Sequence, residues 1–185
     1  VAIGEIVNTG QFDMDAAQRS PGWLKELEGE HTPETEEYGI SSFVFRARRP
    51  FHPERLMALI DSEPMHAVLR SKGFFWIASR HNLGINWSLA GSVARVSPAG
   101  SWLASVPEAQ RPKGQGVEEY IADYWEEPFG DRRQELVFIG IKMPKDEMLE
   151  QLNAALLTDA ELALGEESWE RFADAFPIWQ MQVAN

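Results

Sequence analysis

The stretch Glu135-Leu136-Val137-Phe138-Ile139-Gly140-Ile141-Lys142 decides the fold class of this sequence. Successive side chains of a β-strand point to opposite faces. One face of this strand would carry Leu136, Phe138 and Gly140, and the other would carry Val137, Ile139 and Ile141. Both faces are apolar, which is typical of a strand in the interior of a sheet. We therefore predict a sheet with this strand at its centre.

Segments on either side of this strand supply the other elements of the predicted fold. Apolar alternation and short apolar runs predict further strands at residues 40–48, 67–79, 86–96 and 102–106, with a hairpin turn at 97–100. Apolar residues at helical spacing predict helices that begin near residue 53 and that cover 117–125 and 148–156. Thr158 and Glu161 have the spacing of a capping box, which predicts one further short helix.

The predicted order of elements is β-α-β-β-β-α-β-α. Strands joined by hairpins and mixed with helices predict an α+β domain, with a largely antiparallel sheet of four to five strands and helices packed on one face. His52 lies at the expected N-cap of the first helix, and Pro53 follows at the first helical position. The unbroken apolar run at residues 74–78 follows Gly73 and predicts a strand buried on both faces.

Composition excludes several classes of protein. The chain has 185 residues, of which 44% are hydrophobic and none is cysteine, so disulfide frameworks and thiolate metal sites are excluded. No apolar run approaches the roughly 20 residues that span a bilayer, and no signal pattern opens the chain. We therefore expect a cytoplasmic protein with no membrane partner. The chain begins with Val1 rather than methionine, which indicates a piece of a longer protein.

Charge is distributed unevenly along the chain. Residues 1–37 hold nine acidic and two basic residues, and residues 145–185 hold the same numbers, so each end has a net charge of -7. Residues 38–144 hold thirteen basic and eleven acidic residues, a net charge of +2. We predict an acidic connector at 1–37, an α+β domain at 38–176 and a tail at 177–185. An acidic chain has no long-range attraction for phosphate backbones, so no nucleic-acid partner is expected.

No recognised arrangement of catalytic residues is present in the sequence. The chain has no glycine-rich phosphate loop, no paired-glycine dinucleotide fingerprint and no Gly-x-Ser-x-Gly motif. Carboxylate pairs such as Glu126-Glu127 are adjacent in sequence, so on a helix they diverge. We therefore assign no catalytic, cofactor-binding or metal-binding residue, and expect that this chain alone is not an enzyme.

Two alternative functions depend on local features. His31 lies among Glu30, Glu34, Glu36 and Glu37 and could form part of a weak, free-standing metal-binding module, although a solvated acidic connector explains the same residues. The segment at 72–77 begins Lys-Gly-aromatic, like the aromatic strand of an RNA-binding sheet. That pattern then fails, because a small residue should follow the first aromatic, and packing in the core explains the aromatic residues better.

Basic residues form a second candidate feature, a docking surface for an acidic partner or for another domain of the same polypeptide. If the predicted strands are neighbours, these side chains gather on one face of the sheet. The alternative is a solvated face that balances the acidic helices. The candidate residues are Arg46, Arg48, Arg70, Lys72, Arg132 and Arg133.

Several ordered stretches resemble one known family. They are residues 37–56 (EYGISSFVFRARRPFHPERL), 69–76 (LRSKGFFW), 130–140 (GDRRQELVFIG) and 156–159 (LLTD), preceded by 7–10 (VNTG) and 22–24 (GWL). Together they are similar to the C-terminal domain of the CobW family and to the linker before it. The resemblance extends over nearly the whole chain.

The resemblance implies a two-domain, GTP-hydrolysing metallochaperone for zinc, cobalt or a related divalent metal. In that family the N-terminal domain holds the phosphate loop, the Mg²⁺ site and a Cys-x-Cys-Cys metal motif. None of these is present in this sequence, so no catalytic or metal residue is carried over. The expected role is a non-catalytic accessory domain, either regulatory or client-docking. Its expected partners are the GTPase domain of the same polypeptide and a client metalloprotein, with GTP, Mg²⁺ and the divalent metal bound elsewhere in the full-length protein.

Overall fold

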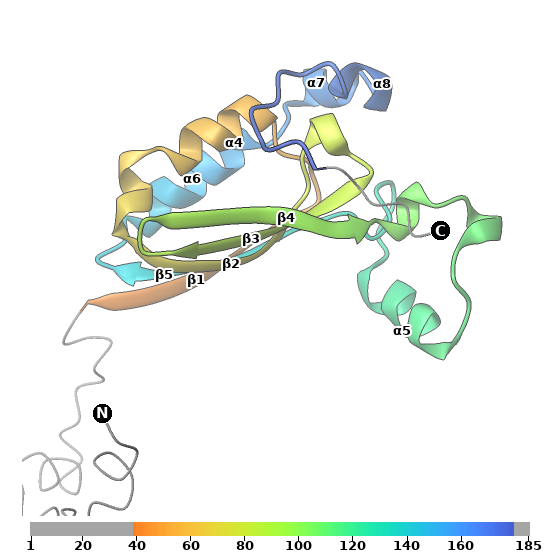
Figure 1. Ribbon diagram of the computed structural model, residues 1–185, viewed down its shortest axis with the longest axis horizontal. Helices are drawn as coiled ribbons and strands as arrows, with labels where there is room; N and C mark the ends of the chain where they lie inside the picture. Colours follow the sequence, from red (N-terminus) through yellow and green to blue (C-terminus); the bar gives the residue numbers. More distant parts are fainter. Residues whose placement is uncertain (1–38, 180–185) are drawn as a thin grey trace, which may run out of the picture. The chain divides into compact units, whose positions relative to one another are not determined.

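The strand predicted at the centre of the sheet is present in the computed structural model, which describes residues 39–179 (Figure 1). The sheet has five strands in the order β1-β5-β2-β3-β4, so β5 has a neighbour on each side. Each neighbouring pair is antiparallel. The strands are β1 (Ile40–Ala47), β2 (Val68–Phe75), β3 (Leu83–Ala90), β4 (Val93–Ser101) and β5 (Gln134–Ile141).

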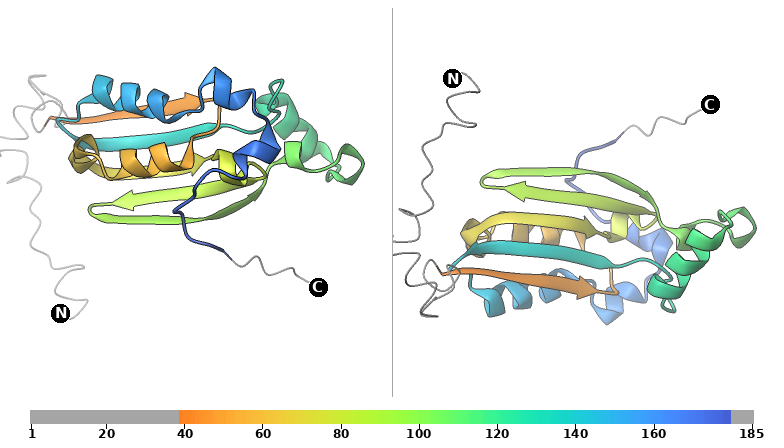
Figure 2. Two further views of the ribbon diagram at one scale, coloured as in Figure 1. Left: turned by 90° about the horizontal axis from the view of Figure 1, so that it is seen from above. Right: turned by 90° about the horizontal axis from the view of Figure 1, so that it is seen from below.

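Helices α4 and α6 lie side by side on one face of the sheet, as the sequence predicted (Figure 2). Helix α5 lies at one end of the sheet (Figure 1). The predicted α+β class and the order of the main elements are confirmed. The helices are α4 (Pro53–Ile60), α5 (Gln115–Tyr124), α6 (Lys145–Ala155), α7 (Asp159–Leu162) and α8 (Glu166–Trp169). None of these helices is both long enough and apolar enough to cross a membrane.

Both predicted helix starts are confirmed. His52 is the N-cap of α4 and Pro53 is its first residue, where a missing N–H leaves no intrahelical bond unmade. Thr158 caps α7, and the side chains of Thr158 and Glu161 form the reciprocal hydrogen bonds of a capping box.

The prediction for the β3–β4 hairpin places the turn at the wrong position in the sequence. The turn was expected at residues 97–100, but it lies at Gly91 and Ser92, between the paired residues Ala90 and Val93. Gly91 has a φ of +57°, a left-handed conformation that glycine adopts without steric strain. Pro98 lies instead inside β4, where it is tolerated because β4 is an edge strand and needs no second partner.

Two further predicted strands are corrected. Residues 102–106 were expected to form a strand, but Leu103–Ser105 form a short 3₁₀ turn. The apolar run at 74–78 was expected to be one strand, but β2 ends at Phe75 and Ala78 begins another 3₁₀ turn. Trp76 leaves the sheet because its backbone N–H donates to the side chain of Gln134, 2.8 Å away. The run from Phe75 to Ala78 is nevertheless buried throughout.

The main core lies between the sheet and the helices α4 and α6. Leu136 and Phe138 of β5 face this core and are only 3% and 2% exposed. Each buried side chain of this size contributes about 1.5–3 kcal/mol of hydrophobic stabilisation. A second apolar cluster surrounds the indole of Trp76 at the end of the sheet. The main core therefore covers only one face of β5.

The expected connector at residues 1–37 lies outside the described residues. Residues 177–179 of the expected tail are described. Arg80 donates to the backbone carbonyl of Pro177 at 2.7 Å, and its guanidinium lies 4.6 Å from the ring centre of Trp179. The expected domain boundaries stay predictions.

Candidate functional site

The face of the sheet opposite α4 and α6 is the candidate functional site, and we call it the open face (Figure 2, right). Directly paired residues of antiparallel strands point to the same side of a sheet. The strand register therefore assigns three rows of side chains to this face. The rows are Arg46-Glu135-Phe74-Asn86-Ser97, Val44-Val137-Lys72-Ser88-Arg95 and Ser42-Ile139-Arg70-Ala90-Val93.

Five of the six predicted docking residues lie on the open face or at its end. Three of them, Arg46, Arg70 and Lys72, are exposed. Arg46 forms an ion pair with Glu135 at 3.6 Å. No ion pair within residues 39–179 involves Arg70 or Lys72. These two charges are therefore available to a partner as far as the described residues are concerned.

Arg95 belongs to the same surface and was not predicted. It is exposed on β4 and shares a row with Lys72, because Ser88 of β3 pairs with both. The alternation of β4 could have placed it there, but the misplaced hairpin turn concealed the pairing.

Arg48 and Arg133 lie at the end of the open face nearest α5 and are engaged by neighbouring groups. The Arg48 side chain contacts Glu126 at 3.2 Å and donates to the carbonyl of Gly130 at 3.0 Å. The guanidinium of Arg133 lies 4.1 Å from the ring centre of Tyr124 and 4.8 Å from that of Phe74. Such cation–π contacts are worth about 0.5–2 kcal/mol each. Arg133 therefore links α5 to the sheet.

Arg132 is the predicted residue that the fold does not bring to the open face. It is 7% exposed, and its guanidinium bonds Glu166 at 2.9 Å and Ser105 at 3.1 Å. The same group lies 5.7 Å from the ring centre of Trp76. This side chain connects the end of the sheet to α8, and it is not available on the surface.

Two clefts flank Arg133. One, of about 510 Å³, is lined by apolar and aromatic residues that include Phe74, Trp102 and Tyr120. The other, of about 500 Å³, lies beside Arg46, Tyr124 and Glu135. Asp131 holds the wall of the first cleft, because its carboxylate accepts from the backbone N–H groups of residues 103 and 104, both at 2.9 Å. The clefts mark the α5 end of the open face.

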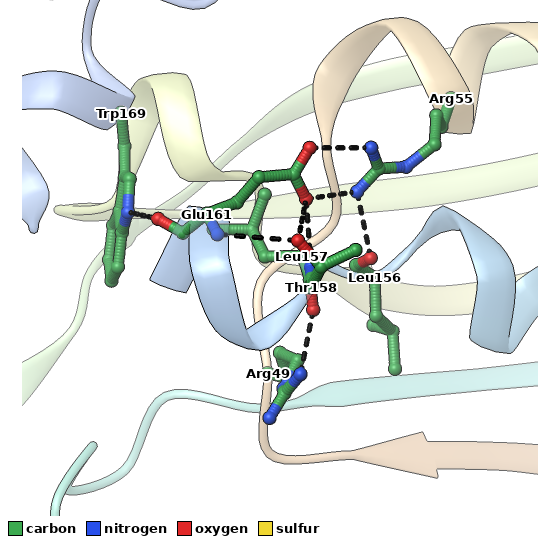
Figure 3. Close-up of polar contacts among 7 residues, drawn as sticks. All are labelled: Arg49, Arg55, Leu156, Leu157, Thr158, Glu161 and Trp169. Carbon is green, nitrogen blue, oxygen red and sulfur yellow. Dashed lines mark hydrogen bonds and ion pairs between the residues drawn. The ribbon is translucent and has the colours of Figure 1, made fainter. Parts of the chain in front are cut away.

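A polar cluster on the helix side joins the start of α4 to α7 (Figure 3). Arg55 donates two hydrogen bonds of 2.7 Å to the carboxylate of Glu161. Arg55 also donates to the carbonyl of Leu156 at 2.9 Å. The hydrogen bonds from Arg55, then those from Thr158, lower the pKa of Glu161 to about 2. The same bonding raises the pKa of Arg55, so both groups are charged at neutral pH.

The stretches that carry the family resemblance meet around this cluster. Arg49 donates to the carbonyl of Leu157 at 2.8 Å and to Asp159 at 2.6 Å. The fully buried side chain of Gln134 donates to the carbonyls of Arg49 and Trp76, at 2.8 and 2.7 Å. Residues from all four of the main stretches are therefore bonded to one another. Their contacts hold the fold together, and they place no reactive group in a cleft.

Histidines were the other candidates for chemistry. No group of three or more potential metal ligands is found within residues 39–179. His31 and its carboxylates lie outside that range, so the metal-binding alternative stays a prediction. Burial, then the charge of Arg55, lowers the pKa of His52, whose ring stacks on Phe172 with the ring centres 4.7 Å apart. His52 is therefore a neutral packing residue at neutral pH.

Two of the three aromatic residues of the segment 72–77 are packed in the interior. Phe75 and Trp76 are 1% and 0% exposed. Phe74 is half-buried and lies edge-on to Trp102, with ring centres 5.8 Å apart. The interpretation of these aromatic residues as core residues is confirmed for Phe75 and Trp76, whereas Phe74 lies on the open face and lines the first cleft.

Comparison with known proteins places the chain in a family. The sequence model described as cobalamin synthesis protein cobW C-terminal domain matches residues 40–156. "Zinc-regulated GTPase metalloprotein activator 1" of Dictyostelium discoideum is 50% identical over 96% of this chain and 38% of its own length. "Zinc chaperone Rv0106" of Mycobacterium tuberculosis is 35% identical over 76% of this chain and 35% of its own length.

A solved structure was also found, the Zn(II)-bound YjiA GTPase from E. coli. It has a TM-score of 0.46 and 16% identity, over 69% of this chain and 33% of the YjiA chain. The chain thus spans less than two fifths of the length of each of these relatives. On the sequence match, the chain belongs to the family of the cobalamin synthesis protein cobW C-terminal domain.

Proposed function

We propose that this domain is the non-catalytic accessory part of a longer, GTP-hydrolysing protein that handles zinc. The names of two relatives, a zinc-regulated GTPase metalloprotein activator and a zinc chaperone, support zinc rather than cobalt as the metal. GTP, Mg²⁺ and the metal would be bound by the rest of that protein, since this sequence has neither a phosphate loop nor a cysteine. The domain's own role would be to dock.

The open face is the surface that we propose for docking, and its partner is the GTPase domain of the same polypeptide. One observation carries the proposal. The sequence of β5 is apolar on both faces, as in strands that are covered on both sides, yet α4 and α6 cover only one. Ile141 on β5 and Val44 on the neighbouring strand β1 are 41% and 42% exposed. A second layer over β5 would bury these side chains.

A binding experiment tests the proposal. The GTPase domain, expressed separately, is mixed with the chain, and both affinity and GTP turnover are measured. The double charge reversal Arg70→Glu/Lys72→Glu is expected to weaken association by about tenfold or more, because it turns an attractive contact into a repulsive one. The matched control is Lys145→Glu/Arg171→Glu, which reverses two exposed charges away from the open face.

Three outcomes would each contradict a part of the proposal. If the two double variants bind equally well, the open face is not the docking surface. If the wild-type chain neither binds the GTPase domain nor changes its GTP turnover, that domain is not the partner. GTP turnover by the chain alone would contradict the non-catalytic role.

A further inference from the structure

We infer that the open face receives one amphipathic α-helix of the GTPase domain, which lies along β5 with its apolar side on Val137, Ile139 and Ile141 and its acidic flank toward Arg70 and Lys72. This inference rests on the proposed function and specifies the chemistry of the partner. It follows from which strands carry apolar residues, which carry charge and which backbone groups are already paired.

The occupant must pack through side chains and not by strand pairing. Strand β5 is hydrogen-bonded to β1 on one side and to β2 on the other. Its backbone groups are therefore already used, and an added strand could pair only at the edges of the sheet, at β1 or β4. An occupant over β5 meets a surface of side chains, which a helix or a second sheet could cover.

The apolar part of the open face is a narrow ridge along β5. On β3, the positions that point to the same face are occupied by Asn86, Ser88 and Ala90. These are the polar and small residues of a solvated sheet face. The continuous ridge is therefore limited to β5 and its neighbour β1, where Val44 lies beside Val137. Val93, on the edge strand β4, is exposed on the same face but is separated from the ridge by β2 and β3. A helix, which is about 10 Å wide with its side chains, matches a ridge that is two strands across.

The positions of the cations argue against a second sheet as the occupant of the open face. Arg70 and Lys72 lie on β2, between the apolar ridge on β5 and the polar positions of β3. A second sheet stacked over the face would bury both cations near the middle of the interface, at a large desolvation cost. A helix over β5 leaves them at its side, where carboxylates on the helix flank can pair with them in contact with water.

The charge pattern also decides between partners. In the three rows of described residues on the open face, four cations, Arg46, Arg70, Lys72 and Arg95, are exposed, and Glu135 is the one carboxylate. Glu135 already contacts Arg46 at 3.6 Å and Arg133 at 3.5 Å. A second copy of this chain would bring like charges together, which opposes association. An acidic helix is complementary to the face, and this is the partner that we infer.

Photo-crosslinking tests the inference in the complex of the chain with the GTPase domain. Because the chain contains no cysteine, Val44→Cys and Ile141→Cys each introduce a single thiol that can carry a short diazirine reagent. Val44 pairs with Val137, and Ile141 lies four residues further along β5, so the two labels are about 14 Å apart along the strand direction. A helix covers that distance in about nine residues, and an extended strand in about four.

We expect the residues captured from the two labels to be about nine apart in the sequence of the GTPase domain, within one segment that carries Asp or Glu on one side. The control variant Ala160→Cys, exposed on α7, should capture nothing. Adding Arg70→Glu/Lys72→Glu should reduce the capture by about tenfold.

The outcomes separate this inference from the proposed function. Captured residues about four apart, or in two separate segments, would overturn the helix while leaving docking on the open face intact. Association without capture from either label would overturn both the helix and the open face as the docking surface. No association at all would overturn the choice of the GTPase domain as partner.

Discussion

The ion pair between Arg55 and Glu161 is expected to be one of the strongest electrostatic contributions to the stability of this domain. Both oxygens of the carboxylate accept from the guanidinium at 2.7 Å, and one of them also accepts from the backbone N–H of Thr158 at 2.8 Å. The side chains of Arg55 and Glu161 are 34% and 24% exposed, so the pair is neither fully solvated nor fully buried. Two-point bonding of this kind is stronger than a single charged hydrogen bond.

The magnitude follows from the pKa of Glu161, which the bonds from Arg55 and Thr158 lower from an ordinary 4.5 to about 2. Each unit of difference between the folded and unfolded pKa corresponds to about 1.4 kcal/mol, which gives about 3.5 kcal/mol as an upper bound. Because water screens a pair that is a quarter to a third exposed, we expect about 2 kcal/mol. Since the folded pKa is the lower one, this stability is complete above about pH 5 and is lost as the pH falls toward about 2.

The assay is urea unfolding of the wild type and of Glu161→Gln between pH 2 and pH 7. The variant should be about 2 kcal/mol less stable at pH 7, and the difference between the two proteins should shrink toward zero near pH 2. Glu167→Gln, at an exposed carboxylate of α8, is the control and should change the free energy of unfolding by less than about 0.5 kcal/mol. A loss at Glu161 that stays the same at every pH would refute the electrostatic explanation.

Three further substitutions test how the sheet is built. Gly73→Ala should destabilise the domain by about 3 kcal/mol or more in thermal unfolding. Gly73 has a φ of +142°, and a Cβ at this position would clash with the carbonyl oxygen of Glu135. A variant as stable as the wild type would contradict this explanation. Gly116→Ala in α5 is the matched control, because a Cβ there meets nothing within 4 Å, and it should be neutral or stabilising by up to about 1 kcal/mol. Gln134→Leu should lower the free energy of unfolding in urea by about 3–5 kcal/mol, because it leaves the backbone N–H and C=O of Trp76 without their partner. A loss of stability below about 1 kcal/mol would show that these groups find other partners.

Features that depend on neighbouring residues were predicted correctly from the sequence. The centre of the sheet, the start of α4 at Pro53 and the capping box at Thr158 each depend on a pattern of a few consecutive residues. The β3–β4 hairpin was misplaced because two turn signals compete there, Gly91-Ser92 and the segment 97–100. Pairing with β2 decides between them, since Trp87 must face the core opposite Gly73, and that information is not local.

The residues predicted for docking show the same division between local and non-local information. Arg70 and Lys72 were placed correctly because alternation along one strand puts them on the same face. Arg132 looks the same in sequence as its neighbour Arg133, but its partner Glu166 lies 34 residues further along the chain. Whether a guanidinium near the end of a strand reaches the surface or is buried against a carboxylate of α8 depends on how α8 packs, which no local pattern contains.

The cations of the open face also explain how an apolar ridge can stay exposed in this domain. Exposed apolar patches favour self-association, and natural sheets oppose it with charged residues beside the apolar ones. Two copies meeting through their open faces would place Arg70 and Lys72 of one near the same residues of the other, without carboxylates to compensate. The charges that we assign to recognition of an acidic helix would thus also keep copies of the domain apart. Arg70 and Lys72 would thus favour the intended partner and oppose self-association. An acidic helix brings carboxylates that neutralise these two charges, whereas a second copy of the domain brings the same positive charges and is repelled.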